Sequence, residues 1–518
     1  MKYVIGIGTM LIALAGGWFV LSPTPVDRPE FDLSRIPVAE PEGCDFVIQP
    51  KWFGENKGVI SAAVAEAQEG ARICVGAGDY VDAIRVDKPL SLIGFGAKLP
   101  LIISNTPADV VQWHADGGTL ENVLLLQAGG VPSGSPVTGQ NGGAAFIIGQ
   151  PDYFNDETHS GLTIINSRVS MTNVGIQNDV FSGVFVSGPK AEVHMSNSAV
   201  SKNAEAGILM IGQASVSLQD TTIADNRNEG IRLDIGAQLT ATGLLVKGNG
   251  GSAVYSQNNA TFEIAGSVFQ NGRAAGILMG HRAGPASVFD TEISGYPGLG
   301  GIAMRGGQDL ALRGVSVSGG ATGILCLPTI SGPDSQPQRI EMRDSKISGN
   351  SRWGVSTSRI CDVRIGNSTI ANNKAGGIEN GGVLVLSGSS VSQNGDNEWA
   401  AGITTGHVSV LKISKSTIAN NRWHGLLLKS GAAVEVETSQ ITNNQDTGVI
   451  VPVLNNSEVS RQQQGMEALI ARHGLSDLGS DIVFRDVEIG PHAVAPWRYD
   501  EGYVPDPSDV KANVVGLN

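Results

Sequence analysis

Basic stretches are missing from this chain, and charge of either sign is sparse. Only 16% of its 518 residues are charged, the formal net charge is −14, and no long run of Lys or Arg occurs. Binding to the phosphates of a nucleic acid requires a basic stripe that displaces counterions. The sequence therefore predicts no nucleic-acid partner, although a local basic patch or a bridging cation would still allow an anionic polymer to bind.

Aromatic residues are scarce too, at 5%, whereas glycine is abundant, with 69 residues. Many Gly, Ser, Asn and Thr residues among Val and Ile suit short strands joined by tight turns, and they do not suit helices. A mean hydropathy of +0.02 leaves ample apolar surface to bury, which argues against a disordered chain.

There are only four cysteines, and none of them forms a Cys-x-x-Cys metal-binding knuckle. They fall as two local pairs, Cys44 with Cys74 and Cys326 with Cys361, which predicts two disulfides in an oxidising compartment. The alternative is four buried free thiols.

The one long apolar run, residues 3–21, follows Lys2 and has about the ~20 residues needed to cross a bilayer. We favour an uncleaved membrane anchor, because Trp18-Phe19-Val20 continues the run past the small-residue site Ala13-x-Ala15. The alternative is a cleaved signal peptide over residues 1–21. Both place the body outside the cytoplasm, anchored in the first case to the inner membrane. The five prolines of residues 22–43 indicate an extended spacer.

A unit of about 23 residues repeats through most of the chain. It reads as Gly-Ile-x-Leu, an alternating strand, a second short strand containing Ser-x-Ile, then Asn and a polar turn. The clearest copies are residues 207–229, 230–252, 354–376 and 425–447. A fixed period of this length predicts a structural unit that cannot bury its own apolar face and must stack on its neighbours.

The repeats resemble the pectin-lyase-like right-handed parallel β-helices over roughly residues 44–455. The fold expected is all-β, a single-stranded parallel β-helix. Residues 44–100 would form the N-terminal cap and first coil, with a short capping helix at residues 59–68, because an open solenoid end exposes unpaired backbone. Repeats follow over residues 101–455, interrupted by insertions at 127–160 and 328–338. Residues 456–518, with a helical stretch at 460–473, would form a helical or irregular C-terminal cap.

An Asn recurs in the turn after the third strand of each repeat. Asn tolerates the left-handed backbone of such turns, and stacked coils about 4.8 Å apart would let the amides form a ladder. We interpret this row as structural. Its members are Asn203, Asn226, Asn249, Asn271, Asn350, Asn373, Asn394, Asn421 and Asn444.

The catalytic signatures of the resembling family are missing. The chain has no Asp-Pro-His motif of alginate epimerases, no paired Asn-Thr-Asp and Gly-His-Gly motifs of polygalacturonases, and no calcium-binding nonapeptide repeats. The resemblance therefore transfers no catalytic residue onto this chain.

Strand alternation predicts which residues of each Gly-Ile-x-Leu-x unit face outward. The first outward row is Phe185, Leu209, Arg232, Tyr255, Leu278, Ala303, Leu325, Ser356, Glu379, Thr404 and Leu427. Polar exceptions gather in consecutive coils, where we predict catalytic residues at Arg232, Asp234, Tyr255, His281 and Arg305 and substrate-binding residues at Gln257 and Arg282. These are the groups a polyuronate lyase or epimerase needs, because Arg neutralises the carboxylate while Tyr or His moves a proton. The alternative is a chance cluster of solvent-facing residues.

Three tryptophans each precede the Gly that opens a coil. We predict that Trp353, Trp399 and Trp423 bind substrate as a platform for sugar rings, the alternative being aromatic residues that seal the edge of the core. Within the first insertion, the residues Asp152, Asp156, Glu157 and His159 suggest a Ca²⁺ site, the alternative being a solvated acidic loop. No cofactor or other metal is indicated.

These features favour an extracytoplasmic protein that binds or modifies a polysaccharide along one face of the solenoid. For an enzyme, elimination or epimerisation of a uronic-acid polymer is the first hypothesis and glycoside hydrolysis the second. The alternative is a non-catalytic envelope scaffold, adhesin or periplasmic assembly factor. An enzyme requires titratable groups that converge in a groove, whereas a scaffold does not.

Overall fold

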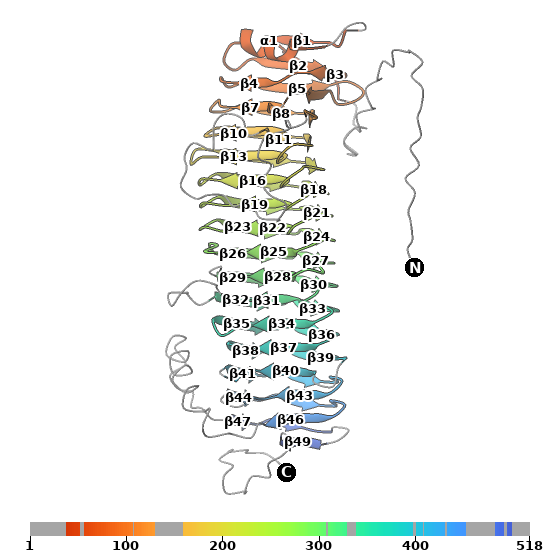
Figure 1. The fold of residues 1–518 in the computed structure, drawn as a ribbon, viewed down its shortest axis with the longest axis vertical. Helices are drawn as coiled ribbons and strands as arrows, with labels where there is room; N and C mark the ends of the chain where they lie inside the picture. Colours follow the sequence, from red (N-terminus) through yellow and green to blue (C-terminus); the bar gives the residue numbers. More distant parts are fainter. Residues whose placement is uncertain are drawn as a thin grey trace, which may run out of the picture.

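In the computed structural model the chain winds into a long parallel β-helix (Figure 1). Every one of the strand pairs between named strands is parallel, and each turn adds one strand to each of three sheets. The described residues are 38–51, 56–106, 108–129, 159–306, 309–328, 338–396, 400–407, 409–429, 432–451, 482–491 and 495–499.

The sheet that matters most for the site has 16 strands and is called the β4–β49 sheet. Its strands are β4 (Ile84–Val86), β7 (Val111–Trp113), β10 (Leu162–Ile165), β13 (Val184–Ser187), β16 (Ile208–Ile211), β19 (Ile231–Leu233), β22 (Val254–Ser256), β25 (Ala275–Met279), β28 (Gly300–Met304), β31 (Ile324–Cys326), β34 (Trp353–Thr357), β37 (Gly376–Asn380), β40 (Ala401–Thr405), β43 (His424–Leu427), β46 (Thr447–Val451) and β49 (Ala495–Tyr499).

A 17-stranded sheet, the β1–β47 sheet, follows it along each turn. Its strands are β1 (Phe46–Ile48), β2 (Arg72–Gly76), β5 (Ser91–Phe95), β8 (Thr119–Glu121), β11 (Arg168–Thr172), β14 (Glu192–Ser196), β17 (Ser215–Gln219), β20 (Gln238–Thr242), β23 (Thr261–Ala265), β26 (Ala286–Phe289), β29 (Asp309–Arg313), β32 (Gln338–Arg343), β35 (Cys361–Gly366), β38 (Val383–Ser387), β41 (Val410–Ser414), β44 (Ala433–Glu437) and β47 (Ile482–Arg485).

The third sheet, the β3–β48 sheet, has 16 short strands. They are β3 (Asp79–Val81), β6 (Leu101–Ser104), β9 (Leu124–Gln127), β12 (Gly175–Asn178), β15 (Ala199–Ser201), β18 (Thr222–Ala224), β21 (Leu245–Lys247), β24 (Val268–Gln270), β27 (Glu292–Ser294), β30 (Ser316–Ser318), β33 (Lys346–Ser348), β36 (Thr369–Ala371), β39 (Ser390–Ser392), β42 (Thr417–Ala419), β45 (Gln440–Thr442) and β48 (Glu488–Ile489).

The capping helix α1 (Val59–Glu66) lies at the N-terminal end of the solenoid, as the sequence predicts (Figure 1). It buries Ile60, Ala63 and Val64. Two of its first amides, those of Ile60 and Ser61, donate to the buried Asp82 Oδ2 at 2.8 and 3.1 Å. The carboxylate thereby satisfies N–H groups that have no partner within the helix.

One continuous core of Ile, Val, Leu and Met side chains runs through the turns. Ile231, Val254 and Ile277 illustrate it, because they occupy one register position on successive strands and are 0% exposed. Stacking of like side chains is how each unit buries the face that it cannot cover alone.

The Asn ladder exists, with one error in its predicted membership. Asn203 Nδ2 donates to Asn226 Oδ1 at 2.6 Å, Asn226 Nδ2 donates to Asn249 Oδ1 at 2.8 Å, and the ladder resumes from Asn350 to Asn444. The predicted member Asn271 is wrong, since it is exposed with φ 57°. Residue 272 takes the ladder position, and its missing side chain leaves room for the buried Tyr296 ring.

Several predicted segments differ from the structure or lie outside the residues that it describes. Strands β47, β48 and β49 fall within residues 456–518, so the predicted C-terminal cap also adds a strand to each sheet. The membrane segment 3–21, the helix at 460–473 and most of both insertions lie outside the described residues. Among the described residues, no helix has the length and apolar character needed to cross a membrane.

Candidate functional site

The outer row of the β4–β49 sheet follows the register predicted from the sequence. Arg232 pairs with Leu209 on one side and Tyr255 on the other, and Ser356 pairs with Leu325 and Glu379. The whole predicted row, from Phe185 to Leu427, lies in one line along the solenoid. The prediction that its members face solvent is wrong for Phe185, Leu209, Ala303 and Thr404, which are buried. Two polar regions interrupt this line, and they are described in turn.

The first polar region, the Arg232 cluster, consists of Glu205, Arg232, Asp234, Tyr255 and Gln257. The Arg232 guanidinium carbon lies 5.5 Å from the centroid of the Tyr255 ring, and Arg232 Nη2 lies 3.8 Å from Asp234 Oδ2. The side chain of Arg232 is only 14% exposed. A guanidinium over an aromatic face is attracted by the ring quadrupole, more strongly as water is excluded.

A glycine makes room for the Tyr255 ring. A Cβ at Gly280, on the neighbouring turn, would lie 2.7 Å from Tyr255 Cε2 and 3.0 Å from its hydroxyl oxygen. Any side chain there would push the phenol out of its place. Gly280 therefore positions Tyr255 without taking part in its chemistry.

A chain of hydrogen bonds fixes the polar ends of the cluster. The Tyr255 hydroxyl donates to Gln257 Oε1 at 2.5 Å, and Gln257 Nε2 donates to Asp234 Oδ2 at 2.5 Å. Asp234 Oδ1 accepts from Asn258 Nδ2 and from the Ile235 amide, both at 2.8 Å. Both oxygens of the buried Asp234 carboxylate are thus occupied, which suits it to hold the turn rather than to move protons.

Burial controls the protonation of two groups in the cluster. It raises the pKa of Tyr255, although the positive charges of Arg232 and Arg305 act in the opposite direction. Burial also raises the pKa of Glu205, against a hydrogen bond from Asn228 Nδ2 and the charge of Arg232. Both groups therefore hold their protons to higher pH than usual.

Glu205 is the member that the sequence did not reveal. It lies in the turn before β16, where its backbone carbonyl accepts from the Asn228 amide on the next turn. The turn has no repeated residue type at this position, so only the folded register brings Glu205 near Arg232. A charged residue two positions before Gly207, which opens the coil, was the one available signal.

The other predicted catalytic residues lie around the cluster rather than in it. Arg305 is exposed two turns beyond Tyr255, within electrostatic range of its phenol. His281 and Arg282 are exposed on the adjacent turn, and their backbone carbonyls accept from the amides of Asn258 and Asn259 at 2.9 and 2.6 Å.

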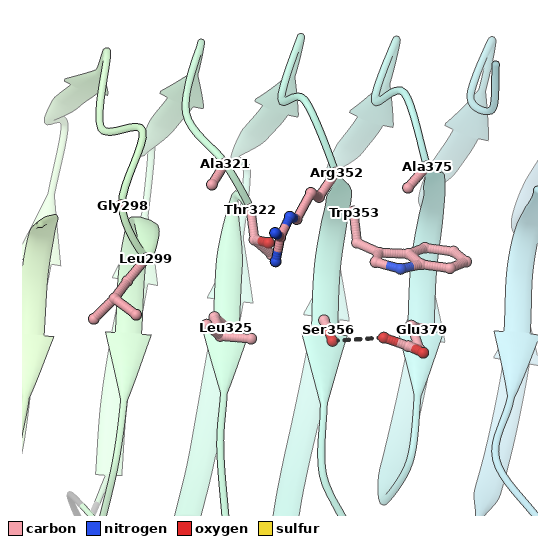
Figure 2. A pocket seen from close by; sticks show the side chains of 10 residues that line it. All are labelled: Gly298, Leu299, Ala321, Thr322, Leu325, Arg352, Trp353, Ser356, Ala375 and Glu379. Carbon is pink, nitrogen blue, oxygen red and sulfur yellow. Dashed lines mark hydrogen bonds between the residues drawn. The ribbon is translucent and has the colours of Figure 1, made fainter. Parts of the chain in front are cut away.

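The second polar region is a pocket of about 320 Å³ farther along the same face (Figure 2). We call it the Trp353 pocket. Its polar lining groups are Thr322, Arg352, Ser356 and Glu379, and its apolar side chains include Leu299, Leu325 and Trp353. At its floor Ser356 Oγ donates to Glu379 Oε2 at 2.8 Å.

Trp353 and Arg352 reach out along the solenoid in opposite directions (Figure 2). The Trp353 ring rests over Gly376, where a Cβ would come within 2.1 Å of the ring and φ is +156°. The exposed Arg352 side chain extends toward Thr322 on the preceding turn (Figure 2). The pocket thus combines an aromatic face, a cation and a carboxylate.

The three predicted tryptophans do not form one row. Trp353 shares its register with Gly376, Ala401 shares its register with His424, and Trp423 therefore lies one position earlier in its turn. The indole Nε1 of Trp423 is buried, and Trp423 does not line the pocket. Trp399 lies outside the described residues. Of the two that the structure describes, only Trp353 lines the pocket.

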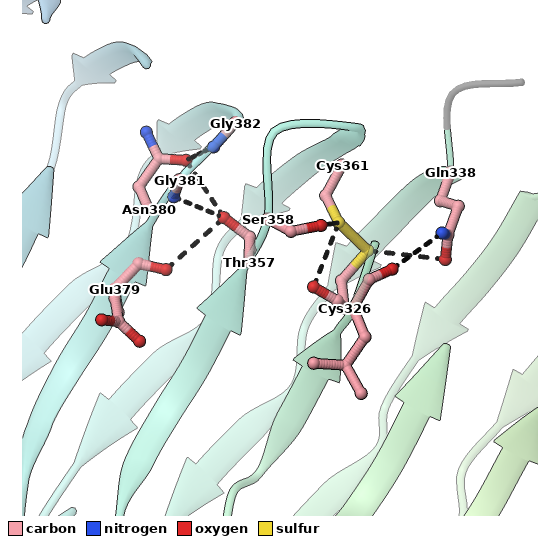
Figure 3. Close-up of a disulfide and its surroundings, with 10 residues drawn as sticks. Cys326, Gln338, Thr357, Ser358, Cys361, Glu379, Asn380, Gly381 and Gly382 are labelled. Atoms are coloured by element: carbon pink, nitrogen blue, oxygen red, sulfur yellow. Dashed lines mark hydrogen bonds between the residues drawn. A yellow bond between two sulfur atoms is a disulfide. The ribbon is translucent and has the colours of Figure 1, made fainter. Parts of the chain in front are cut away.

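A disulfide braces the turns that carry the Trp353 pocket (Figure 3). Cys326 of β31, next to the pocket residue Leu325, is bonded to Cys361 of β35 with a Cα–Cα distance of 6.3 Å. Beside it, Thr357 Oγ1 accepts from the Gly381 amide at 3.0 Å, tying two turns together. The other predicted pair, Cys44 and Cys74, is also a disulfide, and no described cysteine is free.

The proposed Ca²⁺ residues Asp152, Asp156 and Glu157 lie outside the described residues. His159 is described, and its carbonyl accepts from Asn178 Nδ2 at 2.7 Å. Within the ranges that the structure describes, no three His, Cys, Asp or Glu residues gather closely enough to hold a metal ion.

Three solved structures are similar to this chain at low sequence identity and low TM-score. The periplasmic alginate epimerase AlgG is 12% identical with a TM-score of 0.35, and the aligned region covers 68% of this chain and 78% of the AlgG chain. The A-module of the mannuronan C-5 epimerase AlgE4 from Azotobacter vinelandii is 13% identical with a TM-score of 0.34, covering 89% and 96%. The GH87 α-1,3-glucanase from Streptomyces thermodiastaticus is 14% identical with a TM-score of 0.34, covering 90% and 71%.

No curated protein matches the chain in sequence. The family model described as "Right handed beta helix region" matches residues 153–291, 253–395 and 300–462, which together span more than half of the chain. With three parallel sheets in register, the match confirms the predicted fold class. The chain is a member of the right-handed β-helix family.

Proposed function

We propose that this is an extracytoplasmic protein that binds an acidic polysaccharide on the outer face of the β4–β49 sheet, at the Arg232 cluster. One observation carries the proposal: a largely buried guanidinium lies against a phenol ring on the open face of a solenoid. Charge–charge attraction is stronger where water is partly excluded, so Arg232 would attract a uronate carboxylate more strongly than a solvated arginine does.

Neighbouring groups of the cluster would serve the sugar hydroxyls. Tyr255 and Gln257 lie in a hydrogen-bonded chain in which Asp234 fixes the amide, so their polar atoms keep a defined orientation. Arg305, exposed on the same face, would add a second positive charge for a neighbouring uronate. The protein as a whole is acidic, so attraction of an acidic polymer must come from such local positive charge.

Elimination or epimerisation of the uronate is a second candidate function, favoured by the position of the Tyr255 phenol beside the Arg232 guanidinium. A protonated phenol at neutral pH is a proton donor. In elimination, a base such as His281 takes the proton at C5, the C4–O bond breaks, and the leaving oxygen takes the Tyr255 proton. In epimerisation, a proton returns to C5 on the opposite face. Arg232 would stabilise the charge that develops on the carboxylate.

Glycoside hydrolysis is disfavoured by the state of Asp234. Hydrolysis usually requires two carboxyl groups that flank the scissile bond, one to donate a proton and one to act as base or nucleophile. Asp234 has both oxygens engaged in hydrogen bonds, which leaves Glu205 as the one available carboxyl in the cluster.

The extracytoplasmic location rests on the disulfides together with the apolar residues 3–21. Structural disulfides persist in oxidising compartments and are rare in the cytosol. Inner-membrane anchoring through residues 3–21 is part of the same proposal. Fractionation of expressing cells tests it, because an anchored protein stays with the inner membrane after washing with high salt, whereas a cleaved one is recovered in the soluble periplasmic or extracellular fraction.

The binding proposal is tested by calorimetric titration of the full chain, in detergent, with polygalacturonate, polymannuronate, polyguluronate and a neutral glucan. We expect one of the polyuronates to bind, and Arg232→Ala to weaken that binding by about tenfold or more, since a charge-assisted hydrogen bond contributes about 1.5–3 kcal/mol. Arg313→Ala, an exposed arginine of the β1–β47 sheet, is the matched control and should bind as the wild type does.

Catalysis is scored in the same samples by the absorbance of unsaturated uronate and by NMR of C5 epimers. Tyr255→Phe should retain binding and lose product formation if the cluster is catalytic. Binding without any product would make the protein a non-catalytic receptor. Failure to bind every polyuronate, or equal binding by Arg232→Ala, would refute the proposed function and favour an envelope scaffold.

A further inference from the structure

The Trp353 pocket lies on the same outer row as the Arg232 cluster, five strands away. From Arg232 the row passes through Tyr255, Leu278, Ala303 and Leu325 to Ser356. At a strand spacing of about 4.8 Å, the two regions are about 24 Å apart. The row residues in between, Leu278, Ala303 and Leu325, are apolar, and the exposed Arg305 lies beside them at the end of β28.

We infer that the Trp353 pocket is a second sugar-binding site, and that one polymer chain occupies this pocket and the Arg232 cluster at once. We call these two binding sites the two stations. The inference rests on the proposed function, because it takes the same acidic polysaccharide as the ligand. It adds the direction of the bound chain, parallel to the solenoid axis, and a minimum length for full affinity.

The aromatic face of the pocket suits the apolar face of a pyranose ring. Trp353 is half-exposed and lies flat over Gly376, which supports the ring from below with no side chain of its own. Leu299 and Leu325 add apolar contact at the neighbouring turns. Binding sites for small ligands are built in this way, from apolar walls with a few fixed polar groups.

The polar groups of the pocket suit a sugar that carries both hydroxyls and a carboxylate. Arg352 is exposed, and no ion pair involving it occurs among the described residues, so its guanidinium is available to an anionic group. On the opposite side, Glu379 already accepts from Ser356 and has further acceptor capacity for sugar hydroxyls. The pocket volume of about 320 Å³ is at the lower end for small-ligand sites, which suits one or two sugar rings.

Two linked stations predict a distinctive dependence on chain length. An oligomer too short to span about 24 Å binds one station at a time, whereas a longer one engages the second at high effective concentration. With a sugar repeat close to the ~4.8 Å strand spacing, about six units are needed. Affinity should therefore rise slightly up to that length and then by tenfold or more.

The experiment titrates the full chain with uronate oligomers of increasing length, prepared from the polyuronate that binds it. We expect the step in affinity in the wild type and its loss in Trp353→Ala, with short-oligomer binding at the Arg232 cluster unchanged. Gly376→Ala, which displaces the ring without removing it, should reduce the step as well. Trp423→Ala, another edge tryptophan that does not line the pocket, is the matched control, and thermal unfolding confirms that each variant is folded.

Two results separate this inference from the proposed function. A smooth rise in affinity with length that Trp353→Ala leaves unchanged would overturn the two-station inference, while loss of binding in Arg232→Ala would still support the proposed function. If Arg232→Ala binds short and long oligomers as the wild type does, the Arg232 cluster is not a station. Both the proposed function and the inference then fail, whatever Trp353→Ala does.

Discussion

Along the β4–β49 sheet, the inward residues Ile231, Val254 and Ile277 resemble one another in size and polarity, whereas their outward neighbours Arg232, Tyr255 and Leu278 do not. The inward side chains must stack on one another in a close-packed core, where a change in side-chain volume lowers stability. The outward side chains meet no such requirement. A β-helix can therefore vary its binding surface turn by turn while its core stays uniform.

The largest expected effect separates the two faces directly. Ile277→Ala should lower the free energy of unfolding by about 4 kcal/mol, because Ile277 is fully buried and the cavity cannot close within a stacked core. Leu278→Ala, the adjacent half-buried outward residue, should lower it by about 1 kcal/mol. Urea unfolding followed by circular dichroism measures both. Equal losses would contradict the distinction between the faces.

The disulfide between Cys326 and Cys361 joins two buried residues of neighbouring turns, Cys326 in β31 and Cys361 in β35. Replacing both residues with Ala should lower stability by about 3 kcal/mol, since the bond closes a long loop in the unfolded chain. The same loop carries Arg352, Trp353 and Ser356, so binding of long uronate oligomers should weaken too. The Cys44→Ala, Cys74→Ala double variant is the control, with a similar sequence separation but a position far from the pocket. Its binding should not change.

The Asn ladder offers a comparison between a buried and an exposed Asn of the same turn type. Asn373→Ala should cost about 2 kcal/mol, because Asn373 Nδ2 donates to Asn394 Oδ1 and its own Oδ1 accepts from the Asn350 amide. Asn271→Gly, which keeps a left-handed backbone at an exposed position, should change stability by less than about 0.5 kcal/mol. A large loss in Asn271→Gly would mean that Asn271 is structural after all.

The smallest expected effect concerns the interruption of the ladder at Tyr296. Burial raises the pKa of this phenol, so it stays neutral in the folded state while the unfolded state ionises above about pH 10. Stability from this group is fully present below that pH and is lost as the pH rises. Between pH 10 and 11, Tyr296→Phe should lose about 1 kcal/mol less stability than the wild type. Equal alkaline losses would show that another group, such as Tyr80, whose pKa is raised to about 12, dominates.

The repeat period made most of the fold predictable. Strand alternation gave the outward row in its true order, because the side-chain period of a strand leaves only two faces to choose between. Asn271 was misplaced because it holds the left-handed position that Asp225 and Gly248 hold in the preceding turns, and the ladder position, one residue later, falls on Gly272. Segments without the repeat, such as residues 456–518, gave no register, so their three strands could not be assigned to turns.

The site was predictable only where it lay within the repeat. Arg232, Tyr255 and Gln257 sit at repeated outward positions, and their proximity followed from the strand spacing. Glu205 lies in a turn of irregular composition. Trp353 lines the same pocket as Glu379 because of the course of the turn before β34, and strand alternation does not predict that course. Such contacts depend on the three-dimensional course of loops, which periodicity does not encode.

In-register stacking has a consequence for how such a surface can change over generations. Gain or loss of one complete turn between Leu278 and Leu325 would leave every remaining strand with an equivalent partner, so the backbone ladders would simply close up or extend. The separation between the Arg232 cluster and the Trp353 pocket would meanwhile shift by one strand spacing, about 4.8 Å. Duplication or deletion of a single repeat would therefore change the distance between two binding sites on the solenoid in whole steps of one turn.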